Sequence, residues 1–250
     1  MINETEVKYL AGLLDADGYF GFEFRNNRVF YSLILSAATS IDRFGYVLSL
    51  PERTGFGSSH VKSQRIETWA PITAWKVTRA RDIEMLLPRL VKHLVIKGAH
   101  AQRLFDLWQA ARGQDLSELE IEQLKAASKA SRNLAGPLKP RKHPSWAWVA
   151  GYLDGDGSYM NKKSNGQMLV QATAHVNDRV SLDLLHKAFG GHITTRGKNG
   201  EHILDWRHGF GKTQTAFAKK FLGKMVQHSR LKKHKIEEIL SIVNQRTCTD

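Results

Sequence analysis

The stretch Leu10-Ala11-Gly12-Leu13-Leu14-Asp15-Ala16-Asp17-Gly18 recurs later in the chain as Val149-Ala150-Gly151-Tyr152-Leu153-Asp154-Gly155-Asp156-Gly157. Six of the nine positions are identical, and the two copies lie 139 residues apart in a chain of 250. A repeat that opens each half of a chain indicates an internal duplication. Each half is therefore expected to form one structural unit.

Each copy of the motif has the pattern of a short helix that ends in acidic residues. Asn3 is a plausible N-cap with Glu6 as its reciprocal acidic partner, and Ser145 is the plausible cap of the second helix. Apolar residues then recur at helical spacing, and Gly18 and Gly157 stand at the stop positions. Both helices therefore end in two aspartates, beside the negative end of the helix dipole, where carboxylates are disfavoured. A positive group is expected to compensate them.

Small residues in the motif predict that the two helices pack side by side. Ala11-Gly12 and Ala150-Gly151 permit a close approach, because helix separation depends on the side chains at the contact. Such packing would bring Asp17 near Asp156, where like charges repel unless a cation lies between them. Carboxylate oxygens with open positions for water and phosphate suit Mg²⁺. The sequence thus predicts a magnesium site made of two carboxylates across a pseudo-twofold axis.

The first aspartate of each motif has a simpler interpretation. Asp15 and Asp154 are expected to bond backbone amides at the turn from helix to strand, which is a structural role. An EF-hand loop, which also begins Asp-x-Asp, needs glutamate at its twelfth position, where this chain has Asn26 and Asn165. The Asp-x-Asp-Gly start of haloacid-type phosphatases follows a buried strand rather than a capped helix. Both alternatives are therefore disfavoured.

The composition indicates a polyanionic partner. The net charge is +13 and the pI is about 9.9, which in a chain of this size is typical of nucleic-acid binding. The excess is +4 in 1–112, +2 in 113–143 and +7 in 144–250, so both halves are expected to touch the polymer. No apolar run is long enough to span a membrane, and the single Cys248 excludes a disulfide framework. With no evident signal peptide, the protein is expected inside the cell.

Strand and helix patterns predict the same order of elements in both halves, α-β-β-α-β-β-α with a further helix. Alternation puts Phe20, Phe22 and Phe24 on one face of a strand, and this aromatic face is expected to pack on the motif helices. The expected helices are 4–15, 43–50, 80–93, 97–112, 179–189, 211–226 and 231–245, with Asp42 and Asp178 opening 43–50 and 179–189. The first expected hairpin pairs 19–25 with 29–38, and its counterpart in the second half has a turn at 162–166 followed by a strand to His175. Each half is expected to form a second hairpin, whose last strand holds Trp75 or Trp206.

Between the halves, 113–143 changes character and is interpreted as a linker. Its first part, 117–132, is expected to form an exposed helix, and its second part is basic and stiffened by proline. The domain prediction is therefore 1–112, a linker over 113–143, and 144–250.

Polar side chains on the outer strand faces and turns are candidates for contacts to bases or phosphates. They are Glu23, Arg25, Arg28, His60, Lys62, Arg65, Lys76, Lys162, Lys163, Gln171, His175, Arg196, Lys198 and Arg207.

The repeated motif and its spacing resemble the LAGLIDADG homing endonucleases, in particular the single-chain type with two motifs, over most of the chain. The resemblance implies an α+β fold of two pseudo-symmetric αββαββα domains, with the motif helices at the interface and antiparallel sheets forming a DNA-binding saddle. In that family the last acidic residue of each motif binds divalent cations, which carries over to Asp17 and Asp156. Ala16 and Gly155, which precede them, are placed at the metal with them.

The resemblance also implies a lysine at the start of the last helix of each domain that supports the chemistry. Lys97, 80 residues after Asp17, matches this position. In the second half Lys232, 76 residues after Asp156, is the matching choice, and Lys233 is its competitor. A positive charge there would stabilise charge that develops on a scissile phosphate, or help to activate water. The alternative is that these lysines complement a helix end or contact phosphate.

The activity that the resemblance implies is metal-dependent hydrolysis of double-stranded DNA by a monomer at a long, asymmetric target. Mg²⁺ is the expected cofactor; Mn²⁺ is expected to substitute, and Ca²⁺ to bind without supporting cleavage. Many relatives carry a water-organising glutamine where this chain has Ser40 and Val176. Two alternatives stay open: a maturase that binds intron RNA, and a non-cleaving DNA-binding regulator. The gene is expected in an organelle or a bacterium.

Overall fold

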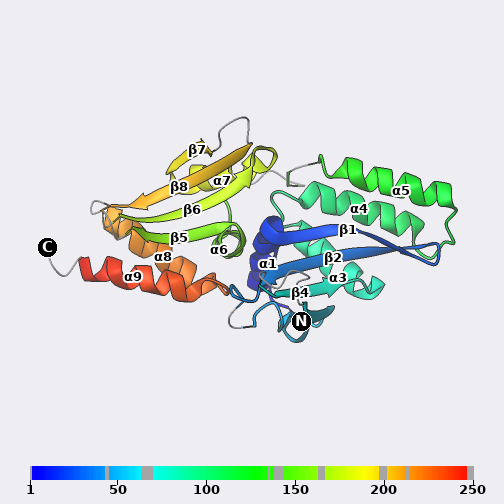
Figure 1. The fold of residues 1–250 in the computed structure, drawn as a ribbon, viewed down its shortest axis with the longest axis horizontal. Coiled ribbons are helices and arrows are strands. Elements are labelled where there is room, and N and C mark those ends of the chain that lie inside the picture. Colours follow the sequence, from blue (N-terminus) through cyan, green and yellow to red (C-terminus); the bar gives the residue numbers. More distant parts are fainter. Residues whose placement is uncertain are drawn as a thin grey trace.

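The computed structural model describes residues 2–42, 45–62, 70–134, 136–137, 143–162, 167–196, 202–211 and 214–246 (Figure 1). The first half contains α1 (Glu4–Asp17), β1 (Gly18–Arg25), β2 (Arg28–Ala38), α2 (Leu50–Thr54), β3 (Ser58–Lys62), β4 (Ile72–Val77), α3 (Ala80–Val91) and α4 (Gly98–Ala111). Helix α5 (Glu118–Ser131) follows in the connecting segment. The second half contains α6 (Trp146–Gly155), β5 (Gly157–Lys162), β6 (Gln167–His175), a 3₁₀ turn (Val176–Asp178), α7 (Arg179–Phe189), β7 (His192–Arg196), β8 (Ile203–Phe210), α8 (Thr215–His228) and α9 (Lys233–Arg246).

Each half builds one antiparallel sheet, and the two sheets have the same topology. The strand orders are β1-β2-β4-β3 and β5-β6-β8-β7. Trp75 and Trp206 occupy corresponding places in β4 and β8, are fully buried, and donate their indole N–H to the carbonyls of Phe56 at 2.9 Å and Gly190 at 2.8 Å. The duplication predicted from the repeat and the α+β fold class implied by the resemblance are both confirmed.

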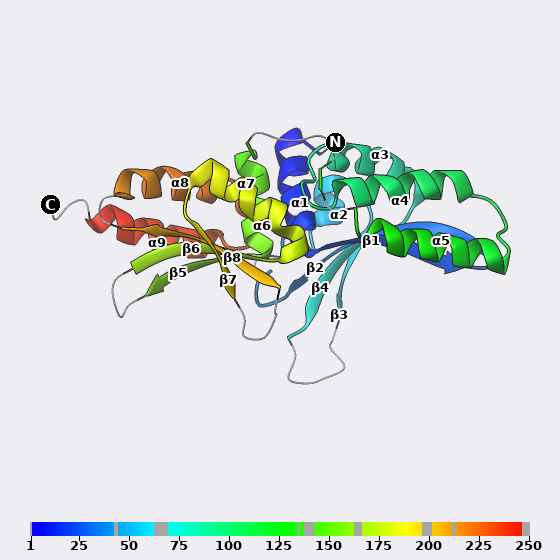
Figure 2. The same cartoon turned by 90° about the horizontal axis from the view of Figure 1, so that it is seen from above.

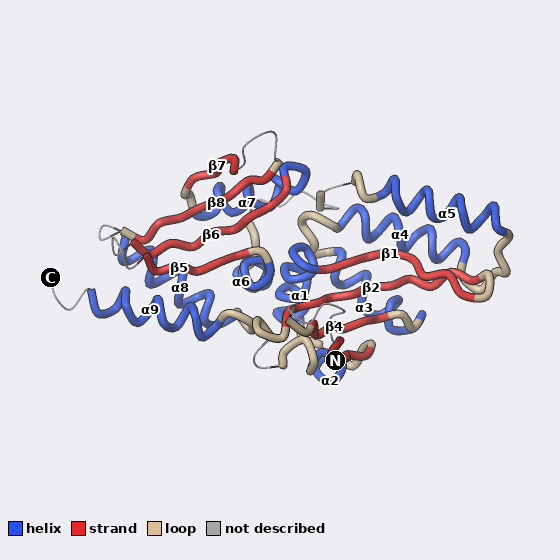
Figure 3. The backbone as a smooth tube through the Cα atoms, in the orientation of Figure 1, coloured by secondary structure: helices blue, strands red, loops and turns tan. Residues whose placement is uncertain are grey.

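Helices α1 and α6 pack against each other at the centre of the molecule (Figure 3). A Cβ atom added at Gly12 would lie 2.0 Å from the carbonyl oxygen of Trp148, and one at Gly151 would lie 2.0 Å from that of Tyr9. Any side chain at either position would therefore push the helix backbones apart. The close approach predicted from the small residues is confirmed.

The helices cover one face of each sheet, and the other faces are left open on the same side of the molecule (Figure 2). In β6 the side chains of Val170 and Ala172 are buried, whereas Gln171 is half-buried and His175 is exposed on the opposite face. The placement of Gln171 and His175 on the outer face of this strand is thus confirmed. The motif helices lie between the sheets, which places their C-terminal ends beside the first strand of each sheet.

The aromatic face of β1 packs on the motif helix only in part. β1 contacts α1, α4 and α5, because the strand leads away from α1 and the other two helices cover its far end. Tyr31, the cross-strand partner of Phe22, packs edge-on against Phe105 and Trp108 of α4. The Lys125 ammonium of α5 lies 5.7 Å from the ring centre of Phe24.

Three local predictions were wrong. The helix expected over 43–50 is instead α2, since Pro51 favours the first turn of a helix and the Asp42 carboxylate accepts from the amide of Val47 in a preceding turn. Helix α6 ends at Gly155 with Asp156 as its C-cap, two residues before the predicted stop. Glu6 is not a reciprocal capping partner, because its carboxylate accepts from Tyr46 and Arg53. The two caps at Asn3 and Ser145 are confirmed.

The connecting segment begins with the predicted helix, α5, which has a capping box between Ser117 and Glu120. It lies beside α4 and β1 (Figure 2), so one of its sides is covered. Gly136 then donates to the carbonyl of Ile96 at 2.7 Å, and its own carbonyl accepts from Ala99 at 3.1 Å. The segment is therefore attached to the backbone just before and at the start of α4.

Candidate active site where the motif helices end

The first aspartate of each motif binds three consecutive backbone amides. Asp15 accepts from Val95 at 2.6 Å, Ile96 at 3.0 Å and Lys97 at 2.9 Å. Asp154 in turn accepts from the amides of the three residues 230–232 at 2.8, 3.0 and 3.2 Å. These amides precede the last helix of each half. The predicted structural role, which is to bind backbone amides, is confirmed, whereas the predicted location at the helix-to-strand turn was wrong.

The same two carboxylates also connect the halves. Trp148 of α6 donates its indole N–H to Asp15 at 2.9 Å, and Tyr9 of α1 donates its hydroxyl to Asp154 at 2.7 Å. Tyr9 and Trp148 precede Gly12 and Gly151 by the same three residues. Each aspartate is buried, and its hydrogen bonds fix both the partner helix and the segment that carries a lysine. The first aspartate of each motif thus connects three parts of the chain: its own motif helix, the partner helix and the segment that carries the lysine.

A lysine from that segment caps the C-terminal end of each motif helix. The Lys97 ammonium donates to the carbonyls of Leu14, Ala16 and Gly18 at 2.9, 3.0 and 2.8 Å. Lys232 donates in the same pattern to the carbonyls of residues 153, 155 and 157 at 3.1, 2.9 and 2.5 Å. These lysines are the positive groups that the aspartate-rich helix ends required.

The structure distinguishes the two lysine candidates of the second half. Lys232 takes the position that matches Lys97, whereas Lys233 lies half-exposed with its ammonium 3.8 Å from Glu237. Burial lowers the pKa of the Lys97 and Lys232 ammonium groups, and the surrounding carboxylates act in the opposite direction. All three N–H groups of each ammonium are engaged by carbonyls, so these lysines supply fixed positive charge rather than an open proton acceptor.

The last aspartate of the first motif reaches the end of the second motif helix. A Cβ atom at Gly155 would lie 2.8 Å from a carboxylate oxygen of Asp17, so the tip of α1 reaches the end of α6. Asp17 is exposed and Asp156 is half-buried. Burial, together with the negative charge of Asp17, raises the pKa of Asp156 to about 7, against the opposing effect of Lys97 and Lys232. The negative charge of Asp17 therefore acts on Asp156 in the direction that the sequence analysis expected.

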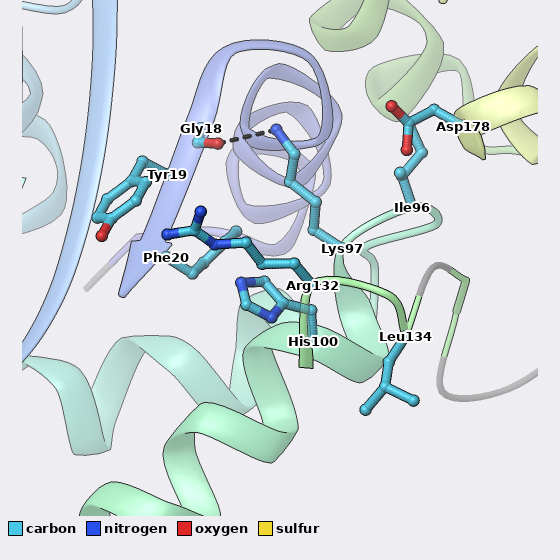
Figure 4. A pocket seen from close by; sticks show the side chains of 9 residues that line it. All are labelled: Gly18, Tyr19, Phe20, Ile96, Lys97, His100, Arg132, Leu134 and Asp178. Carbon is cyan, nitrogen blue, oxygen red and sulfur yellow. Dashed lines mark hydrogen bonds between the residues drawn. The ribbon is translucent and has the colours of Figure 1, made fainter. Parts of the chain in front are cut away.

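A pocket opens beside Gly18, the residue after Asp17, and is lined mainly by residues of the first half and of the connecting segment (Figure 4). Its volume is about 290 Å³, and its polar lining includes Lys97, His100, Arg132 and Asp178. His100, three residues after Lys97, contacts the hydroxyl of Ser131 at 2.9 Å. Arg132 was missed by the sequence analysis, because no local pattern brings the end of the connecting helix to this place. His100 belongs to the segment that was matched to the family but was given no role.

The predicted DNA contacts fall into three groups. Glu23, Arg25 and Lys76 gather on the open face of the first sheet, and Gln171, Arg196 and Arg207 gather on that of the second. Four candidates are exposed and belong to neither cluster: Arg28, His60 and Lys62 in the first half, and His175 in the second. Arg65, Lys163 and Lys198, with the side chain of Lys162, lie outside the described residues. Sequence reasoning missed Asp205, on which the second cluster is built.

Neither a membrane-spanning helix nor a cluster of metal-ligating side chains is found among the described residues. None of the described helices has the length and apolar character to cross a membrane. Within the same described ranges, His, Cys, Asp and Glu side chains nowhere gather in threes or more at a distance that could hold a metal ion. Any ion at the motif ends would therefore rest on two carboxylates and on oxygens from backbone, water or substrate.

The fold has close counterparts among solved structures, although no protein-family model and no curated protein sequence matches the chain. The LAGLIDADG homing endonuclease I-SmaMI bound to cleaved DNA matches with a TM-score of 0.68 and 18% identity, over 97% of this chain and 89% of its own. I-LtrWI bound to target DNA matches at 0.68 and 15%, over 98% and 91%. The meganuclease I-AabMI bound to uncleaved DNA matches at 0.66 and 16%, over 99% and 92%. The chain has the fold of the LAGLIDADG homing endonucleases.

Proposed function

We propose that this protein is a site-specific DNA endonuclease of the homing type, which cuts both strands of its target. The observation that carries the proposal is the duplicated site: Asp17 reaches the end of the helix that is capped by Asp156, and each motif helix has its own lysine at its end. The open faces of the two sheets flank this site on one side of the molecule (Figure 2). The net charge of +13 and the DNA-bound neighbours support DNA as the substrate.

The residues fit a divalent cation at this site. Two crowded carboxylates, one with a pKa raised to about 7, would be relieved by a positive ion, and their donor atoms are oxygens, as Mg²⁺ prefers. Asp17 and Asp156 would hold the metal, and Ala16 and Gly155, whose carbonyl oxygens accept from Lys97 and Lys232, directly precede them in the chain. Bound Mg²⁺ would supply Lewis-acid stabilisation of phosphate oxygens and activation of water. Mn²⁺ is proposed to substitute; Ca²⁺ is proposed to bind only, and one I-SmaMI structure holds uncleaved DNA with calcium ions.

The other site residues position the lysine segments and stabilise negative charge. Asp15 and Asp154 fix the segments that carry Lys97 and Lys232. Each lysine caps the end of its own motif helix, and its positive charge would stabilise charge that develops on a scissile phosphate. One such set in each half suits one phosphate in each strand. Because the open faces of the two halves carry different side chains, the proposed target is asymmetric, and because one chain supplies both halves, the proposed active form is a monomer.

Cleavage of a DNA library tests the proposal. The protein is incubated with plasmids that carry randomised or host-gene inserts and Mg²⁺, and the ends of double-strand breaks are sequenced. Wild type is expected to cut a defined site. Asp17→Asn and Asp156→Asn are expected to lower the rate roughly a thousandfold while DNA binding in Ca²⁺ is retained. Asp183→Asn, at an exposed ion pair on α7, serves as the matched control.

Three outcomes would contradict the proposal. If wild type binds a DNA site but cuts nothing with Mg²⁺ or Mn²⁺, the protein is a non-cleaving regulator. If it binds intron RNA with salt-dependent affinity and cuts no DNA, the maturase alternative holds. If Asp17→Asn and Asp156→Asn both cut as well as wild type, the reaction does not take place at the motif ends.

A further inference from the structure

A fully buried carboxylate lies on the open face of the second sheet. Asp205 in β8 has no exposed surface, although its strand neighbours on that face are solvent-accessible. Its oxygens accept from the hydroxyl of Thr173 in β6 at 2.7 Å and from Nη2 of Arg207 at 2.9 Å. The Nε of Arg196 in β7 lies 3.5 Å away. The strands β6, β8 and β7 are adjacent in the sheet (Figure 1). They thus place two arginines beside one carboxylate.

The contacts around Asp205 close into a ring. Arg207 donates its Nε–H to the amide oxygen of Gln171 at 3.1 Å, and the amide nitrogen of Gln171 donates to the hydroxyl of Thr173 at 3.4 Å. Thr173 in turn donates to Asp205, which holds Arg207. In such a ring each member limits the rotamers of the next, and a held arginine loses less conformational entropy when it binds.

The ring holds Arg207 by one edge only. Nε and Nη2 form the side edge of the guanidinium, and both are bound to the protein. Neither N–H of Nη1 takes part in the ring. The end of the planar guanidinium, formed by Nη1 and the outer N–H of Nη2, can therefore donate to a ligand. The Arg207 side chain is 47% exposed, whereas that of Asp205 is 0% exposed. The arginine can reach a ligand that the carboxylate cannot.

The chemistry of that fork selects a particular base. An arginine fork matches O6 and N7 of guanine in the major groove, and this bidentate pair is the commonest specific contact between proteins and DNA. The amide of Gln171, in contrast, is engaged at both its oxygen and its nitrogen, so it supports Arg207 rather than reading an adenine.

We propose that Asp205 is a positioning residue for base recognition, which holds Arg207 so that the second half reads a guanine at one position of its half-site. This inference rests on the proposed DNA-binding function and names a determinant of its specificity. Arg196, whose side chain is 56% exposed, shares the carboxylate and extends the same patch.

The first half provides a natural control, because its carboxylate is built differently. Glu23 accepts from Ser32 at 2.9 Å and from Arg25 at 2.6 Å, and it forms an ion pair with Lys76. Its side chain is 25% exposed and its arginine is 65% exposed. An ammonium is a point charge, and Arg25 reaches the carboxylate through one nitrogen, with its guanidinium 6.0 Å from the ring centre of Phe30. The first half is therefore expected to discriminate less sharply through this group.

Selection of binding sites tests the inference without requiring cleavage. The protein is incubated with a randomised double-stranded DNA library in Ca²⁺, and bound molecules are recovered and sequenced. Wild type is expected to prefer guanine at one position of the half-site that the second half contacts, by about fivefold to a hundredfold. Asp205→Asn and Arg207→Lys are both expected to reduce that preference several-fold at the same position only. Glu23→Gln is expected to leave it unchanged.

Each result distinguishes this inference from the proposed function. If wild type selects no sequence at all, the proposed function fails and the inference fails with it. If wild type selects a site but Asp205→Asn leaves every base preference unchanged, or weakens all positions equally, only the inference is overturned. Thermal unfolding of each variant identifies loss of fold. Thr173→Val, which removes one donor to the carboxylate, is expected to relax the same position and provides the result if Asp205→Asn does not fold.

Discussion

At the ends of α1 and α6 the two halves of the molecule use the same contacts, whereas on the open faces of their sheets they use different ones. Lys97 and Lys232 each bond three carbonyls of the preceding motif, and Asp15 and Asp154 each bond three amides. On the open faces, the first half has the partly exposed Glu23, whereas the second half has the fully buried Asp205. The two halves are therefore built alike at the centre and differ on the open faces of their sheets.

The largest expected effect concerns the symmetric contact between the motif helices. Gly12→Ala and Gly151→Ala would each place a methyl group about 2.0 Å from a backbone carbonyl that cannot move without separating the helices. We expect each to lower the free energy of unfolding by about 3–5 kcal/mol, or to prevent folding. Chemical denaturation measures the change.

Gly223→Ala in α8 is the control for both variants. A Cβ at Gly223 meets nothing within 4 Å, so the higher helix propensity of alanine should leave stability unchanged or raise it by up to about 1 kcal/mol. If Gly12→Ala were no worse than Gly223→Ala, the helices would not be in contact through this glycine, and the central symmetry of the two halves would have to be abandoned.

The next largest effect concerns the lysine caps. Lys97→Met and Lys232→Met remove three hydrogen bonds each and leave partly buried carbonyls at a helix end without their donor. We expect a loss of about 2–4 kcal/mol in unfolding free energy, and the same loss in both halves. Lys233→Met, at an exposed ion pair, is expected to change it by about 0.5 kcal/mol or less.

Unequal losses would show that the halves differ even at their centre. A loss from Lys233→Met as large as that from Lys232→Met would contradict the assignment of Lys232 as the counterpart of Lys97. Melting curves at several protein concentrations separate these changes from any effect of association.

The sequence predicted what local patterns can encode. Spacing and alternation revealed the repeated unit, the motif helices and the sheets, because periodicity depends only on neighbouring residues. It did not reveal the amides that Asp15 binds, since they lie about 80 residues further along the chain. Nor did it reveal Asp205, because a single acidic residue in a strand gives no local sign of arginines above it. Helix α2 was misplaced because the signal from Asp42 was taken as a cap rather than as a turn before Pro51.

A smaller effect, which depends on pH, tests the repulsion at the centre. The pKa of Asp156 is raised to about 7 in the folded protein, above its ordinary value of 3.8. In a chelator, this group therefore stabilises the fold at low pH, and that stability is lost as the pH rises from about 4 through 7. Asp156→Asn removes the cost of an ionised carboxylate at this position in the folded protein. At pH 8 the variant is therefore expected to be more stable than wild type by about 1–3 kcal/mol.

Adding Mg²⁺ provides the control for this comparison. A bound cation would offset the repulsion in wild type, so the difference from Asp156→Asn at pH 8 should shrink in magnesium. If the two proteins show the same dependence of unfolding free energy on pH in chelator, Asp156 is not crowded by Asp17 and the basis of the paired site is lost.

The smallest expected effect is at the opposite ends of the motif helices, where the two halves use different residues for the same purpose. Asn3 accepts from the amide of Glu6 at 2.9 Å, and Ser145 accepts from that of Trp148 at 3.2 Å. Asn3→Ala and Ser145→Ala should each lower the unfolding free energy by about 1 kcal/mol, since both remove one cap from one helix. Because the caps lie far from the carboxylates along each helix, DNA affinity and the sequence of the selected site should not change. A change in base preference from either variant would mean that the central helices transmit strain to the sheets, and that the separation between a symmetric centre and divergent faces does not hold.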